Sequence, residues 1–203
     1  MKITSSILVL ALVGLGNLTN FAIAGESAAA IDNHLCSICH GYGGTTTNEL
    51  FPQLAKQPKE YLATELKEFR DHTRYDENAK RFMWGIASRL TDSEIEALAE
   101  FYSAQDVAHP GKIRNQAQYD RGQTIFQKGI EDKGVPACFT CHGSKAEGHE
   151  LIARLGGQNE NYLLRQLRAF HMGVRETGHV MNFVTGALTD EDLMALAQYL
   201  QAQ

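Results

Sequence analysis

The chain has 203 residues and a formal net charge of −5, with 43% hydrophobic and 21% charged residues. This ordinary globular composition excludes intrinsic disorder, a collagen-like repeat and a polytopic membrane protein. The acidic balance argues against a nucleic-acid-binding protein, which would need a basic face. The four cysteines are too few for a disulfide scaffold at this length, and the scarcity of proline favours helix over sheet.

Residues 1–24 are predicted to form an export signal. Lys2 is the only charged residue before Glu26, and an apolar run occupies residues 7–15. Small residues flank the middle position of 22–24, so we expect cleavage after Ala24. The alternative is an uncleaved membrane anchor, but polar residues interrupt the apolar run and leave it short for a membrane span. Export of this kind places the mature protein in the bacterial periplasm, which is an oxidising compartment.

The rest of the chain contains an internal duplication. Residues 36–41 read Cys-Ser-Ile-Cys-His-Gly, and residues 138–143 read Cys-Phe-Thr-Cys-His-Gly. Matched residues follow both motifs at a spacing that drifts only in loops, as expected of two copies of one fold. The matched pairs are Leu54 and Leu155, Gln57 and Gln158, Tyr61 and Tyr162, Phe69 and Phe170, Arg74 and Arg175, Met83 and Met181, and Thr91 and Thr189. We therefore predict two domains, 25–110 (copy one) and 111–203 (copy two), with a linker over roughly 103–118.

Each copy is predicted to be helical, because no segment alternates convincingly at period two. The expected helices, in chain order, are 26–33, 59–69 and 92–102 in copy one, then 119–130, 161–170 and 190–200 in copy two. Thr91 with Glu94, and Thr189 with Asp192, resemble capping boxes that open the closing helix of each copy. Apolar residues behind each cap recur at helical spacing, which indicates one buried stripe. The fold class is therefore predicted to be all-α, with aromatic stripes in the core.

The Cys-x-x-Cys-His motif is the attachment signature of a c-type haem. Two thiols at this spacing can each add to one vinyl group of the same haem, and the adjacent histidine then lies under the iron. A thioredoxin-like redox pair does not require the histidine, and a four-cysteine zinc site places its pairs about 15–20 residues apart. Two motifs within a duplication, behind an export signal, instead predict two covalent haems. The predicted residues are Cys36, Cys39 and His40 in copy one, and Cys138, Cys141 and His142 in copy two.

A methionine is the expected second axial ligand in each copy. Met83 and Met181 align with each other, each seven residues before the Leu-Thr-Asp that opens the closing helix. A lone methionine is usually a core residue, but the duplication favours these two as ligands because Met/His is a common c-type pair. Met172 aligns with an aspartate. In copy two, His179 or His171 remains an alternative ligand.

Together these features resemble the dihaem cytochrome c4 family, in which two class I cytochrome c domains stand in tandem. The resemblance covers the whole mature chain and rests on the two motifs, on 51–57 with Tyr61, and on 155–158 with Tyr162. It implies two helical domains, each wrapped around a covalent haem c. It also implies an exported electron carrier, often loosely membrane-associated, between a quinol–cytochrome c reductase-type donor and an oxidase-type acceptor.

Two positions depart from the family pattern. Pro52 fits the family's proline, whose carbonyl accepts the N–H of the proximal histidine, but copy two has Ala153. A backbone carbonyl remains available there, so the bond can survive. Lys56 replaces a usual glycine, which we expect to affect backbone approach or a surface contact and not the haem.

Electron transfer is expected in preference to catalysis, because a six-coordinate His/Met iron leaves no open position for a substrate. The alternative is a cytochrome subunit of a dihaem dehydrogenase or of a flavin-linked complex, for example a sulfur-oxidising one. The chain carries no flavin or nucleotide motif, so any such activity would depend on another chain.

Overall fold

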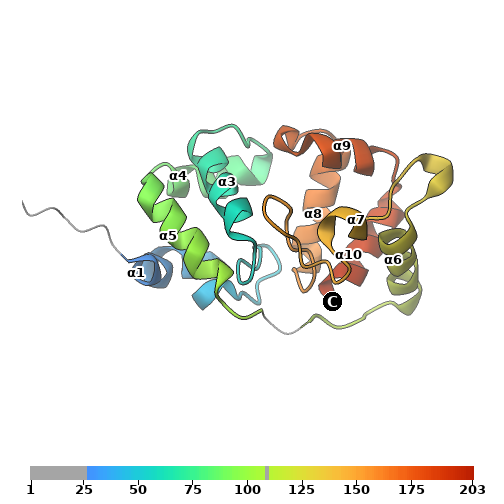
Figure 1. Cartoon of the computed structure of the whole chain (residues 1–203), viewed down its shortest axis with the longest axis horizontal. Helices are drawn as coiled ribbons and strands as arrows, with labels where there is room; N and C mark the ends of the chain where they lie inside the picture. The colour runs from blue at the N-terminus through green and yellow to red at the C-terminus, as the bar shows by residue number, and fades with distance from the viewer. Residues whose placement is uncertain (1–26, 108–109) are drawn as a thin grey trace, which may run out of the picture.

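The computed structural model describes residues 27–107 and 110–203. The predicted export signal with its cleavage after Ala24, and part of the predicted linker, lie outside the described residues. The described part of the chain is mostly helical and has no strand beyond two isolated bridges, so the all-α prediction is confirmed. The helices of the two copies form two groups that lie side by side (Figure 1). No described helix is long and apolar enough to cross a membrane.

Copy one contains four-residue and twelve-residue helices joined by irregular turns. Its helices are α1 (Ala28–Ile31), α2 (Ser37–His40), α3 (Lys59–Arg70), α4 (Trp84–Ala87) and α5 (Asp92–Ser103). Two five-residue π-helical turns, Asp32–Cys36 and Ala79–Met83, lead directly into α2 and α4. The predicted helix over 26–33 is therefore the start of a longer helical path that runs into the cysteine motif.

Copy two also has five α-helices among its described residues, and its first helix is longer than that of copy one. Its helices are α6 (Gln116–Lys128), α7 (Phe139–His142), α8 (Glu160–His171), α9 (His179–Gly186) and α10 (Asp190–Gln201). Helix α6 begins before the predicted residue 119 because the Asn115 side chain accepts a hydrogen bond from the Gln118 N–H. It ends before the predicted residue 130 because Gly129 leaves the helix with φ +69°. Helix α9 and its irregular counterpart in copy one were absent from the prediction.

Both predicted capping boxes are present at the start of the closing helices. The Thr91 and Thr189 side chains accept the N–H groups of Glu94 and Asp192, and the two carboxylates accept the threonine N–H groups in return. Each box satisfies two backbone donors that a helix start otherwise leaves unpaired. The first residues of α5 and α10 could therefore be predicted from the local sequence.

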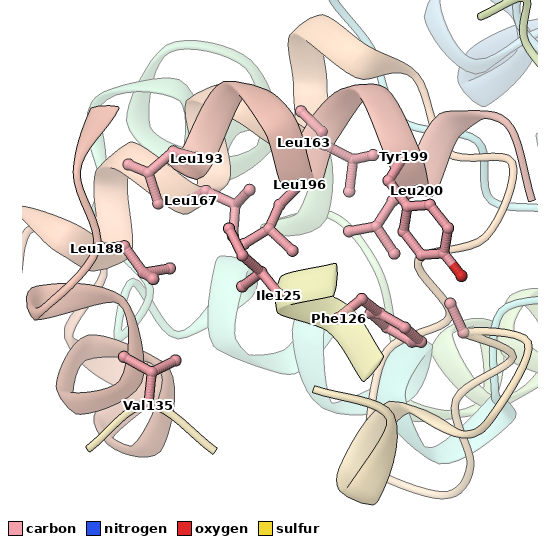
Figure 2. Packing of buried hydrophobic residues seen from close by; sticks show 12 residues of the cluster. Ile125, Phe126, Val135, Leu163, Leu167, Leu188, Leu193, Leu196, Tyr199 and Leu200 are labelled. Atoms are coloured by element: carbon pink, nitrogen blue, oxygen red, sulfur yellow. The ribbon is translucent and has the colours of Figure 1, made fainter. Parts of the chain in front are cut away.

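Each copy has a hydrophobic core of its own, and the two cores share no residue. In copy two, α10 crosses α6 and packs Leu196 and Leu200 toward Ile125 and Phe126 (Figure 2). The crossing is close at Gly122, where an added Cβ would lie 2.1 Å from the Ala195 carbonyl oxygen. A compact crossing of the first and last helices of copy two thus supports the chain segment that carries its cysteine motif.

The two copies also meet across a buried polar interface. Arg74 and Arg175, which are matched residues of the repeat, both donate to the Gln166 Oε1 at 2.8 Å. Both guanidinium groups also pair with the Glu65 carboxylate. Arg74 further pairs with the buried Asp76 at 2.9 Å. A single carboxylate of copy one therefore bridges two buried cations, one from each copy.

Candidate functional site

The first cysteine motif places a buried histidine beside two thiols. Cys36 ends a π-helical turn, and α2 carries Cys39 and His40. His40 is buried, and its Nδ1 lies 3.0 Å from the Pro52 carbonyl oxygen. A carbonyl can only accept, so Nδ1 carries the proton and Nε2 keeps a free lone pair. This arrangement orients the imidazole as a metal ligand usually is, with its other ring nitrogen held by the protein.

The second motif repeats this arrangement with a different residue behind the histidine. Helix α7 carries Cys141 and His142, and Cys138 stands at its N-cap. His142 Nδ1 lies 2.9 Å from the Ala153 carbonyl oxygen. The expectation that a backbone carbonyl would serve without proline is therefore confirmed. The bond needs only a carbonyl at this position, and not the ring of the side chain.

Burial sets the charge state of these groups. It lowers the pKa of His40 and of His142 and so favours the neutral imidazole that binds a metal. Before haem attachment, burial raises the pKa of the Cys36 thiol, and it raises the pKa of the Cys138 thiol to about 11. None of the four cysteines is joined to another in a disulfide. No group of three His, Cys, Asp or Glu side chains among the described residues is arranged to hold a metal ion.

The segments that carry Met83 and Met181 are anchored in the same way. Trp84 Nε1–H donates to the Arg74 carbonyl oxygen at 2.9 Å. Asn182, with its amide turned to satisfy its neighbours, donates to the Arg175 carbonyl oxygen at 3.1 Å. Each methionine is therefore followed by a side chain that binds the carbonyl of the matched arginine. The residues that follow the two aligned methionines thus make equivalent contacts in the two copies.

The other candidate ligands of copy two have different surroundings. Met172 caps the end of α8 and is 64% exposed. His171 Nδ1 lies 2.8 Å from the Thr185 carbonyl oxygen and so ties α8 to α9. His179 is the exposed first residue of α9. These positions favour Met181, which packs against the core of copy two, over Met172.

The residues around each motif fit a haem. Each copy supplies two thiols, an imidazole with a free Nε2 and a thioether, which is the donor set of a covalent His/Met haem. Large apolar side chains stay exposed near these donors, which is typical of a binding surface for an apolar group. They are Ile38, Phe82, Phe139, Val180 and Phe183. Phe51 lies edge-on to both His40 and Phe82, with ring centroids 6.0 and 5.5 Å apart, and so joins the motif to the methionine segment.

Comparison with known proteins agrees with this chemistry. The cytochrome c family model matches residues 26–104 and 119–203. The solved cytochrome c4 of Acidithiobacillus ferrooxidans superposes with a TM-score of 0.74 at 34% identity, over 83% of this chain and 98% of that one. The chain belongs to the dihaem cytochrome c4 family.

Two curated relatives of this cytochrome c4 family member have different names. Cytochrome c-552 of Acidithiobacillus ferridurans is 33% identical over 89% of this chain and 83% of its own length. The thiosulfate dehydrogenase electron acceptor of Thiomonas intermedia is 36% identical over 96% of this chain and 90% of its own length. The family establishes two covalently bound haems c and an electron-transfer protein that is not an enzyme. Its partners are redox proteins.

Sequence reasoning found the matched pair Gln57 and Gln158 but assigned it no role. Both side chains are buried between the two copies and bind the backbone of the opposite copy. The available signal was a polar residue matched in both copies, five positions after the carbonyl that holds the histidine. Their partners lie about 100 residues away, so only the folded arrangement reveals them.

Proposed function

We propose that this protein is an exported, periplasmic electron carrier with two His/Met-ligated haems. His40 and Met83 bind the iron of copy one, and His142 and Met181 bind the iron of copy two. Thioether bonds to Cys36 and Cys39, and to Cys138 and Cys141, hold the two porphyrins. The methionine ligands are supported by one observation: the segments that contain Met83 and Met181 are hydrogen-bonded to the backbone carbonyls of Arg74 and Arg175, which are matched residues of the repeat. We further propose 25–110 and 111–203 as the two haem domains.

The residues of this chain prepare each iron site for electron transfer. A bound haem supplies a one-electron Fe(III)/Fe(II) couple. The carbonyls of Pro52 and Ala153 hold the two imidazoles with Nε2 free to bind, which reduces the movement that a change of oxidation state requires. The thioethers of Met83 and Met181 would complete the ligand set of each bound iron. Neither iron then has an open site, so the protein transfers electrons without making or breaking bonds to a substrate.

The proposed partners are a quinol–cytochrome c reductase-type donor and an oxidase-type acceptor. A second candidate role is to accept electrons from a sulfur-oxidising dehydrogenase, because one relative at 36% identity is named as the electron acceptor of thiosulfate dehydrogenase. Loose membrane association fits the first role. Reduction of the purified holoprotein by quinol-oxidising membranes supplied with quinol, and by a thiosulfate dehydrogenase supplied with thiosulfate, measured side by side, separates the two roles.

Haem stoichiometry and ligation test the proposed function. Protein made with a haem-attachment system should carry two haems that survive acid–acetone extraction, and its oxidised spectrum should show a weak red-edge band from Met–Fe(III). Cys36→Ser or Cys138→Ser should leave one haem on a single thioether. A mass equal to the bare polypeptide would contradict attachment. A missing red-edge band, with both haems attached, would contradict methionine ligation alone.

A further inference from the structure

The peptide group between Pro52 and Gln53 is hydrogen-bonded at both ends. Its carbonyl oxygen accepts the His40 Nδ1–H at 3.0 Å. Its N–H, which belongs to Gln53, donates to the Gln158 Oε1 of the other copy at 2.7 Å. Gln158 Nε2 donates in turn to the Gln53 carbonyl oxygen at 2.9 Å. A histidine of copy one and a glutamine of copy two are therefore joined through one peptide group.

The matched peptide group of copy two has the same bonds in the opposite direction. The Ala153 carbonyl oxygen accepts the His142 Nδ1–H at 2.9 Å. The Arg154 N–H donates to the Gln57 Oε1 of copy one at 3.0 Å, and Gln57 Nε2 donates to the Arg154 carbonyl oxygen at 2.8 Å. The two bridges are thus related by the repeat, and each crosses from one copy to the other.

The bridge to Gln158 is buried, and the bridge to Gln57 is partly buried, because Arg154 keeps some exposure to water. The residues Gln53, Gln57 and Gln158 are 7%, 5% and 3% exposed. Hydrogen bonds are electrostatically stronger in such surroundings, and a chain of them polarises its members. When the peptide N–H donates to a glutamine oxygen, electron density shifts to the peptide carbonyl, which then becomes a better acceptor for the imidazole N–H. An imidazole whose N–H is held more strongly is a more basic ligand.

We propose that each copy sets the reduction potential of the haem in the other copy. Gln158 acts on the haem held by His40, and Gln57 acts on the haem held by His142. A more basic imidazole stabilises Fe(III) over Fe(II), so each glutamine lowers the potential of the haem across the interface. The two glutamines are positioning residues that act through a peptide group and a histidine. The inference rests on the proposed function, in which His40 and His142 bind the irons.

The test uses the intact two-haem protein and two crossed variants. Gln158→Leu and Gln57→Leu keep a similar side-chain volume and remove the acceptor. NMR spectra at poised potentials, with haem methyl signals assigned to each copy, give the two midpoint potentials separately. Gln158→Leu should shift the potential of the His40 haem upward, with a smaller change at the His142 haem. Gln57→Leu should shift the His142 haem upward, with a smaller change at the His40 haem.

A matched control separates this effect from looser docking of the copies. Asn161 of copy two donates to Glu49 of copy one without contacting either peptide group. Asn161→Ala should leave both potentials unchanged. Hydrogen exchange of the Gln53 and Arg154 amides gives a second readout, and each should exchange faster in the variant that removes its acceptor. If Gln158→Leu does not fold, Gln158→Asn withdraws the acceptor by one methylene and should give the same upward shift.

Several results would overturn the inference. A shift that falls mainly on the haem of the mutated copy would mean that the glutamine acts within its own copy. Faster amide exchange with unchanged potentials would mean that the hydrogen bond forms but does not affect the reduction potential of the haem. An equal shift in Asn161→Ala would assign the effect to docking. In each case the wild-type His/Met spectrum still tests the proposed function independently.

Discussion

Single residues in the two copies show which properties each position needs. Lys56 adopts the left-handed conformation with φ +60°, and its matched residue Gly157 has φ +70°. The backbone shape is therefore the same, and the N–H of each residue donates to a carbonyl of its own closing helix, at Tyr102 and Leu200. The departure at Lys56 stays local, because the neighbouring carbonyl of Pro52 still holds His40. Backbone geometry matters more at these positions than side-chain identity.

The choice of the second axial ligand leads to a prediction at the residue scale. Met181→Ala should open one iron to cyanide or carbon monoxide, because it removes the thioether from the sixth position. Met172→Ala is the control, since Met172 is exposed at the end of α8. Absorption spectra with added ligand report binding. Opening of the iron by Met172→Ala would show that the alignment near the second ligand is wrong.

At the scale of elements, the crossing of α6 and α10 depends on the absence of one side chain. A Cβ at Gly122 would lie 2.1 Å from the Ala195 carbonyl oxygen and 2.7 Å from the Tyr199 Cβ. Because the nearest atom belongs to the backbone of α10, the helices must separate to admit a methyl group. Such a change strains the rigid core on which copy two is built.

Gly122→Ala should therefore destabilise the protein by about 1–3 kcal/mol, the usual cost of overpacking a core. Gly186→Ala in α9 is the matched control, because a Cβ there meets no atom within 4 Å among the described residues. Alanine at that position should be neutral or slightly stabilising, since glycine weakens a helix. Denaturant unfolding followed by circular dichroism measures both. Equal stability of the Gly122→Ala protein would contradict the close crossing.

The start of α10 should make the stability of copy two sensitive to acid. Burial raises the pKa of Asp192, but hydrogen bonds from Thr189, Arg121 and Lys133 outweigh it and lower this pKa to about 2. The folded pKa lies below the unfolded value, so the contribution is complete above pH 4 and is lost as pH falls toward 2. Allowing for solvent screening, the contribution is about 1–2 kcal/mol.

Asp192→Asn should remove this acid-dependent loss and lower stability at neutral pH. Glu191→Gln, at an exposed neighbouring position of α10, should retain the loss. Unfolding free energies between pH 2 and 6 for the three proteins measure the difference. An unchanged acid dependence in Asp192→Asn would assign the loss to other carboxylates.

At the scale of the whole molecule, a buried ionic cluster joins the copies. Glu65 lies between Arg74 and Arg175, and the two arginines raise the cost of removing its charge. Burial raises the pKa of Glu65, but the two guanidinium groups outweigh this effect and lower it. The residue of copy two that matches Glu65 is Gln166, to which both arginines donate. Copy two therefore contributes an amide at this position and not a second carboxylate.

Glu65→Gln should destabilise the protein by about 3–5 kcal/mol, because it leaves the buried Arg175 guanidinium without its carboxylate partner, whereas Arg74 keeps Asp76. We also expect the copies to unfold in two steps once their shared cluster is broken. Glu96→Gln is the control, because its pair with Lys67 is exposed and is worth about 1 kcal/mol or less. Calorimetry of the holoproteins reports both effects. A single transition of unchanged stability would show that the cluster does not couple the copies.

The charge distribution gives a prediction for the two haems. Residues 25–110 contain 14 acidic and 8 basic residues, whereas residues 111–203 contain 10 of each. Negative surroundings stabilise Fe(III), so the haem on His40 should have the lower potential and should receive electrons first. The effect is modest, because salt screens exposed charges beyond about 8 Å. Haem-resolved potentials should converge as salt rises, and a lower potential at the His142 haem would contradict this direction of flow.

The sequence by itself determined the features that depend on neighbouring residues. The two cysteine motifs, the threonine caps and the apolar spacing of α3, α5, α8 and α10 are all local signals within about two helical turns. Duplication made these signals stronger, because each was present twice. The carbonyl partner of each histidine was also predictable, although it lies 11 or 12 residues away, since the family resemblance placed it.

Only the tertiary structure decided which residues join the two copies. The glutamine bridges and the cluster around Glu65 join residues that lie about 100 positions apart. A polar side chain in an interface has no periodic pattern, so nothing local distinguishes it from a solvated one. The π-helical turn before α4 was also missed, and the Trp84 side chain that follows it binds the Arg74 carbonyl, which lies ten residues away. Such contacts form only when folding excludes water, because buried polar groups then bind whichever partners the fold brings within reach.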